Sequence, residues 1–242
     1  MSDAQLIAAA YGEMILQEQG GPLNNEFPPP ALAVVTHKNR LWVASAEDDR
    51  AVWYSKMFVR NEGPGFNVLQ QVRVDDSPDG ITALASLDDK LVIFTRSRIY
   101  YVVGDGPADT GTNGAFSDPF LVTSAAGCLD ARSVVTFDGG VCFQSKGGLY
   151  LLTRGLQVEF VGANVQETFR LYNTVLAVSH DPDRSWLVWL CQRGGAGGEI
   201  FGPKAVFIVW DYLRKAWFTW TTAAADSGGV LAQTFVGGVH AW

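Results

Sequence analysis

The chain has 242 residues, of which 48% are hydrophobic, 12% are aromatic and only 18% are charged. This composition fills a sizeable core and excludes an intrinsically disordered chain. The formal net charge of −7 argues against a dedicated nucleic-acid binder, because such proteins carry a basic face. An acidic surface past which DNA slides stays compatible with this charge, because like charges prevent adhesion.

Residues 1–30 are predicted to be an N-terminal extension with a proline-rich lead into the folded part. Ser2–Ala10 is compatible with a short helix that Asp3 caps, and Tyr11–Gln17 with a strand. Pro28–Pro30 then gives a stiff, extended segment. The N-terminus lacks a basic start followed by a long apolar run, and no stretch approaches about 18 apolar residues. We therefore expect neither a secretory signal nor a membrane span.

From Ala31 onward, apolar runs of five to eight residues alternate with turns rich in Gly, Asp and Asn. The runs contain many Val, Ile, Phe, Tyr and Trp residues, which favour strands, and no helical period of useful length is present. They form a repeating unit of three strands and two tight turns, followed in most units by a fourth strand. The predicted units begin at residues 31, 81, 132, 175 and 230, with fourth strands at 66–74, 119–123, 156–161 and 217–221.

The pattern within the strands favours a particular architecture. Leu91–Phe94 and Val206–Trp210 are apolar at every position, which indicates strands covered on both faces. In a β-propeller each blade lies between two others, whereas a two-layer sandwich predicts alternation. We therefore predict an all-β, β-propeller-like array of four-stranded antiparallel blades over residues 31–242, with a sandwich or another β-meander as the alternative.

The array is expected to be incomplete, at about four and a half blades. The fifth unit has two strands and stops at Trp242. An open half-blade leaves an unpaired edge, which invites association. Either Tyr11–Gln17 closes the ring, or the chain is part of a longer protein, which is the interpretation we favour.

No residue pattern in the chain predicts catalysis or a cofactor. Cys128, Cys142 and Cys191 lie far apart without zinc-ligand spacing, and we expect three buried free thiols. His37 and His180 occupy equivalent predicted turns, so a common site on one rim is possible in a repeat fold. Ordinary polar turn residues are the favoured interpretation.

One loop carries several oxygen ligands at short spacing. Asp105, Asp109 and Asn113 offer oxygens of the type that calcium prefers, but the spacing is not that of an EF-hand and a terminal bidentate Glu is missing. A plain surface loop is favoured over a metal site, because Asp, Gly and Asn are common turn residues.

Five of the eight tryptophans fall late in the chain, at positions 186, 189, 210, 217 and 220. Core packing is favoured for the three inside apolar runs. Trp217 and Trp220, beside Lys215, are predicted to be the exposed pair and are the candidate ligand or partner contact. A carbohydrate- or receptor-binding β-propeller module is accordingly one functional hypothesis.

Two stretches resemble a known family. They are Ile81–Phe94, continuing through Arg98–Tyr100 to Gly104–Pro107, and Ala131–Val135, followed by Gly147–Leu152. The pair resembles virion proteins of tailed bacteriophages, and the nozzle, or tail tubular, proteins of short-tailed phages are the nearest family. The resemblance covers about residues 20–220, and its motifs define no active site. Members of this family are usually much longer, which agrees with an incomplete chain.

The resemblance implies a non-enzymatic structural component of the virion tail, made in the cytoplasm of the bacterial host. Such nozzles are ring-forming homo-oligomers, often hexamers, around the channel through which DNA leaves during ejection. Other tail proteins, such as the adaptor and the fibres, would be partners. DNA would pass without specific binding, which the acidic balance of the chain permits.

Overall fold

The structure is a computed structural model that describes residues 22–193, 205–221, 234–236 and 239–241. Within these residues the chain forms four antiparallel four-stranded sheets, each with its strands in sequence order. The predicted helix at Ser2–Ala10 and strand at Tyr11–Gln17 lie outside the described residues. The first sheet consists of β1 (Ala31–His37), β2 (Arg40–Ser45), β3 (Ala51–Tyr54) and β4 (Gln71–Arg73). The second consists of β5 (Ile81–Leu87), β6 (Lys90–Thr95), β7 (Ile99–Val102) and β8 (Phe120–Thr123).

The third and fourth sheets repeat this order. The third consists of β9 (Val135–Phe137), β10 (Gly140–Ser145), β11 (Gly148–Thr153) and β12 (Val158–Phe160). The fourth consists of β13 (Thr174–Asp181), β14 (Trp186–Gln192), β15 (Ala205–Asp211) and β16 (Ala216–Thr221). The all-β class and the four-stranded antiparallel units are therefore confirmed. In the fifth unit, β17 (Thr234–Val236) pairs with β18 (Val239–Ala241) and with no other described strand.

The repeat is geometric as well as topological. The second strands β2, β6 and β10 begin at residues 40, 90 and 140, a constant spacing of 50. The first strands β1, β5 and β13 share a break in register near their start, between Ala31 and Ala33, Ile81 and Ala83, and Val175 and Ala177. Such a bulge increases the local twist of a strand. The same irregularity at the start of the first strand therefore recurs in three units whose sequences are only weakly similar.

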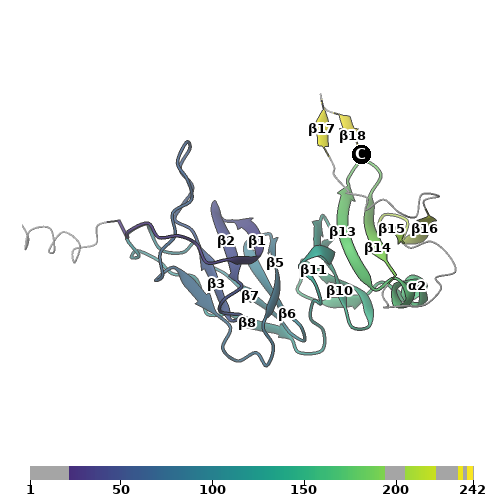
Figure 1. The fold of residues 1–242 in the computed structure, drawn as a ribbon, viewed down its shortest axis with the longest axis horizontal. Coiled ribbons are helices and arrows are strands. Elements are labelled where there is room, and N and C mark those ends of the chain that lie inside the picture. The colour runs from purple at the N-terminus through teal and green to yellow at the C-terminus, as the bar shows by residue number, and fades with distance from the viewer. Residues whose placement is uncertain (1–21, 194–204, 222–233, 237–238, 242) are drawn as a thin grey trace, which may run out of the picture.

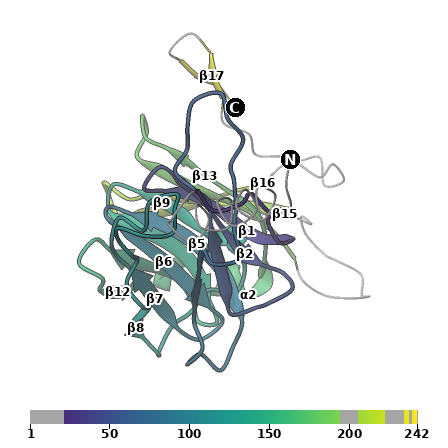
Figure 2. The same cartoon turned by 90° about the vertical axis from the view of Figure 1, so that its left-hand side faces the viewer.

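The sheets lie side by side along the long axis of the molecule (Figure 1). The first strands are neighbours: β1 contacts β5, β5 contacts β9 and β9 contacts β13. Because each first strand meets the next, the sheets fan out from a shared inner line, as the blades of a propeller do (Figure 2). Three hydrophobic clusters fill the three gaps between the four sheets. Within the described residues no cluster joins the fourth sheet to the first, so the array is open.

Each middle sheet is buried on both faces. In the second sheet, Ile93 packs toward the first sheet, whereas Val92 and Phe94 pack toward the third. The rings of Phe94 and Phe143 meet across this second gap with centroids 4.9 Å apart. Burying a large apolar side chain stabilises the fold by roughly 1.5–3 kcal/mol, and the continuous apolar runs supply such side chains to both gaps at once.

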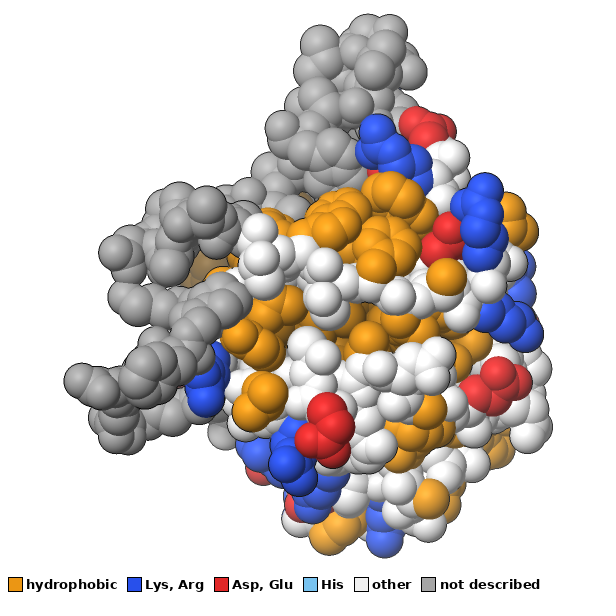
Figure 3. Space-filling model, turned by 90° about the vertical axis from the view of Figure 1, so that its right-hand side faces the viewer, with side chains coloured by type: hydrophobic (Ala, Val, Ile, Leu, Met, Phe, Trp, Pro, Cys, Tyr) orange, Lys and Arg blue, Asp and Glu red, His pale blue; other side chains and the backbone are white. Residues whose placement is uncertain are grey.

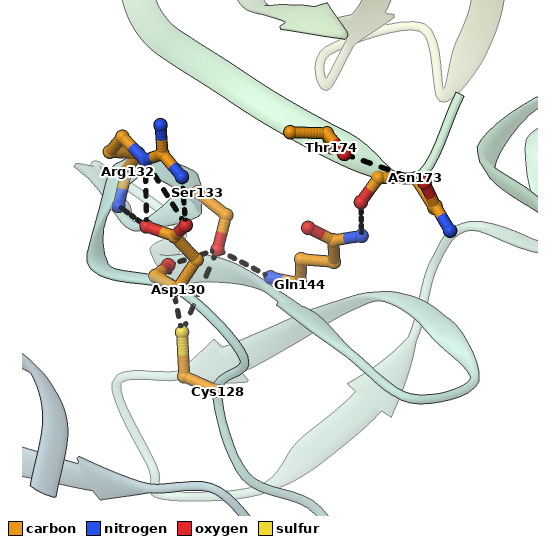
Figure 4. Close-up of polar contacts among 7 residues, drawn as sticks. All are labelled: Cys128, Asp130, Arg132, Ser133, Gln144, Asn173 and Thr174. Atoms are coloured by element: carbon orange, nitrogen blue, oxygen red, sulfur yellow. Dashed lines mark hydrogen bonds and ion pairs between the residues drawn. The ribbon is translucent and has the colours of Figure 1, made fainter. Parts of the chain in front are cut away.

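A polar network joins the third sheet to the fourth (Figure 4). The Ser133 hydroxyl donates to the Asp130 carbonyl at 2.7 Å and accepts from the Gln144 backbone N–H at 3.1 Å. The Gln144 side-chain amide donates to the Asn173 carbonyl, just before the fourth sheet, at 3.0 Å. Trp189 of β14 donates its indole N–H to the Ser133 carbonyl. These bonds satisfy polar groups that the packed sheets would otherwise leave buried without partners.

Short helical segments occur at two places, and the first of them replaces part of a predicted strand. Residues 132–137 were expected as one strand, but Ala131–Ser133 forms the 3₁₀ helix η1 and only Val135–Phe137 is strand. The Asp130 side chain accepts from the Arg132 N–H and so starts η1 as a helix cap. A further 3₁₀ turn, η2 (Ala163–Val165), leads into α2 (Gln166–Leu171), and Val165 and Phe169 pack into the third gap.

Candidate binding surfaces on the fourth sheet

The two tryptophans predicted as an exposed pair lie on the same strand but on opposite faces of the fourth sheet. Trp217 and Trp220 are three positions apart on β16, and side chains alternate along a strand. Trp217 turns toward the third sheet and lies parallel to Trp210, with centroids 5.5 Å apart and an angle of 10°. Trp220 turns away and contacts Trp186 and Phe218. The pair therefore belongs to two different surfaces and cannot form a single platform.

The surface on the Trp220 side faces away from the rest of the array. We call it the outer face, and its side chains are Trp186, Val188, Leu190, Phe207, Val209, Phe218 and Trp220. Trp186, Phe218 and Trp220 form a triangle of rings with centroids 5.2–5.6 Å apart. Trp220 is 43% exposed, and Val188, Leu190 and Val209 are buried. Hydrophobic side chains gather on this side of the molecule (Figure 3).

The surface on the Trp217 side borders a cleft between the third and fourth sheets. This cleft has a volume of about 510 Å³. Four aromatic rings form its wall: Phe137, Trp210, Tyr212 and Trp217. Four polar side chains stand on its rim, each from a different element or turn: Asp138, Glu159, Asn164 and Lys215. The cleft thus combines an apolar wall with hydrogen-bonding groups.

The turn between β15 and β16 sets the geometry of this cleft. Buried Asp211 accepts from the Arg214 backbone N–H at 2.8 Å and from the Arg214 guanidinium at 2.8 Å. These bonds hold the pKa of the Asp211 carboxyl below its usual value. Lys215 then adopts a left-handed conformation, with φ of 53°. The turn between β13 and β14 has the same design, with Asp181, Arg184 and a left-handed Ser185.

The two histidines take part in different packing contacts. His180 of β13 lies 3.2 Å from the Tyr212 hydroxyl and edge-on to Phe137, beside the cleft. His37, the last residue of β1, bonds to Ser86 between the first and second sheets. Burial lowers the pKa of both imidazoles. The structure does not join them in one site, because His37 lies between the first and second sheets and His180 lies beside the cleft at the fourth sheet.

The oxygens of the Asp105–Asn113 loop are used in contacts within the protein. Asp105 pairs with Lys38 at 2.7 Å, and the Asp109 carboxylate accepts from the Met57 N–H at 3.1 Å. Over the described ranges, no three His, Cys, Asp or Glu side chains gather as metal ligands would. All three cysteines are buried and free, as expected. A helix long and apolar enough to cross a membrane is also absent from the described part of the chain.

A second cavity, of about 570 Å³, lies where the first three sheets meet. Leu32, Ile81 and Thr82 contribute to its floor, and Asp49, Arg96, Asp130 and Arg132 bring two charges of each sign. Arg132 is already engaged, because its guanidinium bonds to the Asp130 carboxylate at 2.5 Å. This cavity therefore has a balanced charge and a less aromatic lining than the cleft.

Comparison with known proteins gives no family for this chain. No family model matches it, and no curated protein matches it. Among solved structures, a computationally designed protein, Ika8, is 15% identical with a TM-score of 0.42, over 84% of this chain and 52% of that chain. PorZ, a bacterial surface component of the type-IX secretion system of Porphyromonas gingivalis, is 11% identical with a TM-score of 0.40, over 83% of this chain and 29% of that chain. The chain thus spans about half of the first structure and under a third of the second.

Proposed function

We propose that this chain is a structural component of a bacteriophage tail, of the nozzle type, and that it forms part of an oligomeric ring around the DNA exit channel. In this role it is not an enzyme, and it works by contact with further copies and with other tail proteins. The observation that carries the proposal is the outer face, an aromatic sheet surface at the end of an open array.

The outer face resembles the surfaces that the other sheets bury. Side chains of the same kind, such as Phe94 and Phe143, close the gap between the second and third sheets. Exposed aromatic patches on soluble proteins mark interaction sites, and Trp is enriched at the centres of protein interfaces. The part of this face that is still open to solvent, exposed Trp220 and the half-buried Trp186 and Phe218, gains free energy when a further sheet covers it.

The opposite end of the array also offers an apolar surface. Val34 of β1 is 53% exposed, and Trp53 on the same side of the first sheet is half-buried, whereas Val43 between them is buried. Contact between the outer face of one copy and the first sheet of the next is heterologous, and a heterologous contact builds a ring when its rotation closes. The net charge of −7 suits a channel wall that DNA passes without adhering.

Assembly of the purified chain tests this proposal. We expect light scattering after size exclusion and negative-stain images to show rings, either alone or after mixing with the adaptor protein of the same phage. Trp220→Asp should shift the population to monomers, because it places a charge in the contact. Leu121→Asp is the matched control, since Leu121 on β8 is similarly exposed, at 48%, but lies on a sheet with neighbours on both sides. Monomers alone, with and without tail partners, would overturn the proposal.

A further inference from the structure

The polar side chains on the rim of the cleft are available to a ligand. Glu159 of β12, Asn164 of η2 and Lys215 of the β15–β16 turn are exposed. None of these three side chains forms a hydrogen bond or an ion pair with another described residue. Asp138, in the turn between β9 and β10, is also exposed, and only its backbone carbonyl is bonded, to Arg154. The rim therefore offers two carboxylates, one amide and one ammonium group around a single opening.

The wall below this rim is rigid and aromatic. Trp217 lies parallel to Trp210, and Trp189 stacks on Trp217 at 6.0 Å. Phe137 packs edge-on to Trp210 at 5.9 Å and against Tyr212 at 4.8 Å. Because the rings hold one another in place, little side-chain entropy would be lost when a ligand packs against them.

We infer that this cleft binds an oligosaccharide. The apolar C–H faces of a sugar ring pack on aromatic side chains, while its hydroxyls need acceptors and donors around them. Carboxylates supply the acceptors, the ammonium group supplies donors, and the amide supplies both. The volume of about 510 Å³ falls within the range of roughly 300–1,000 Å³ that small-molecule sites occupy.

The charge of the rim selects against the other ligands that stack on aromatic rings. Asp138 and Glu159 carry two negative charges and Lys215 carries one positive charge, so the rim has a net charge of −1. Single-stranded nucleic acid also stacks on such rings, but it requires a positively charged groove for its phosphates. A neutral sugar is not repelled, and its hydroxyls donate to the carboxylates.

The cleft and the outer face lie on opposite sides of the same sheet. Trp217 points to the cleft, whereas Trp220 points to the outer face. A sugar in the cleft leaves the outer face free, so sugar binding and ring assembly are separate properties that can be measured independently. If the chain binds sugar, this structural component would also recognise a surface that carries glycans.

A glycan array and titration calorimetry test the inference. The full chain is applied to an array of hexoses, N-acetylhexosamines, deoxyhexoses and their short oligomers, with a thymidine oligonucleotide as the comparator. The strongest oligosaccharide is then titrated to about 10 mM, which detects even weak, millimolar binding. We expect saturable binding of at least one sugar and none of the oligonucleotide.

Substitutions of two exposed rim residues, with a matched control, test whether the sugar binds in the cleft. Glu159→Gln replaces a charged acceptor by a weaker neutral one, and Asn164→Ala removes a hydrogen-bonding amide, so each should weaken sugar binding about tenfold. Glu167→Gln should change it less than twofold, because Glu167 lies on α2, outside the cleft lining, and pairs with Arg170. No sugar binding, binding that neither rim variant weakens, or oligonucleotide binding in the cleft would each overturn the inference. Ring assembly of the same variants should be unchanged, which separates this result from the test of the proposed function.

Discussion

His37 of β1 and Ser86 of β5 are joined by a hydrogen bond of 2.8 Å between Nδ1 and Oγ. The bond links the innermost strands of the first and second sheets at a position where His37 is almost completely buried. The sequence places His37 in a turn, whereas the structure shows it as the last residue of β1, where it links two successive sheets. Its burial also makes the contact sensitive to pH.

Acidification between pH 7.5 and 5.5 should destabilise the fold. Burial lowers the pKa of His37 below 6.5, with the positive charge of Lys38 acting in the same direction, and burial also lowers that of His180. The unfolded chain therefore takes up protons first, so stability is full above the unfolded pKa and declines as pH falls through about 6.5. Urea unfolding at both pH values measures this difference. It should shrink in His37→Gln, and a free energy of unfolding that rises on acidification would contradict the assignment.

Loss of the Ser86 hydroxyl should weaken the link between the first two sheets. We expect Ser86→Ala to lower the free energy of unfolding at pH 7.5 by about 1 kcal/mol, the usual contribution of one hydrogen bond. Thr110→Ala is a suitable control, because its hydroxyl bonds only to Thr112 on the surface. Equal effects of the two substitutions would show that the His37 contact does not stabilise the fold.

Substitution of Arg40 should lower the free energy of unfolding more than substitution of an exposed arginine. Its guanidinium is buried, donates to the carbonyls of Ser55 and Pro107, and lies over the rings of Tyr54 and Phe116. Arg40→Met removes both donors and leaves two buried carbonyls without partners, which should cost about 2–4 kcal/mol. Because the bond to Pro107 holds the Asp105–Asn113 loop, limited proteolysis should also cleave this loop faster. Unchanged cleavage would argue against that role.

The buried carboxylates of Asp181 and Asp211 should stabilise the two turns of the fourth sheet in which each pairs with an arginine. Asp181 accepts from the backbone N–H groups of Asp183 and Arg184 at 3.1 and 3.3 Å. Asp181→Ala removes the acceptor that these donors share, and we expect a loss of about 1–3 kcal/mol in thermal or urea unfolding. Asp211→Ala should act in the same direction and should also reshape the cleft. Asp118→Ala, at an exposed loop position, is the control and should leave stability unchanged.

The three thiols should be inert in the folded protein. Burial raises the pKa of Cys128 to about 11 and that of Cys191 to about 12, and it raises the pKa of Cys142 well above the usual value. Because the thiolate is the reactive form, a disulfide reagent at pH 8 should modify none of the three until the protein is unfolded. Rapid modification of one thiol before unfolding would show that its surroundings open in solution.

Much of the fold follows from local sequence pattern. Runs such as Leu91–Phe94 predicted strands with two buried faces, and the second sheet is buried on both sides. The turns confirm the same logic, since Lys38 and Asn39 both adopt the positive φ that a two-residue hairpin turn requires. The alternation of side chains along β16 also predicts that Trp217 and Trp220 lie on opposite faces. Residues 217 and 220 differ by an odd number of positions, so a strand must place them on opposite faces.

The sequence by itself determined that short strands alternate with tight turns and roughly where each strand lies, because apolar periodicity and turn chemistry act over a few residues. Only the tertiary structure decided which helix and which cleft form between the sheets. Helix α2 depends on Phe169 packing into the third gap, since six residues are too few to hold a helix through local bonds. The cleft exists because Asp138 and Glu159 of one sheet meet Lys215 and Trp217 of the next. Contacts between residues so distant in the chain depend on how whole sheets pack, which no local pattern specifies.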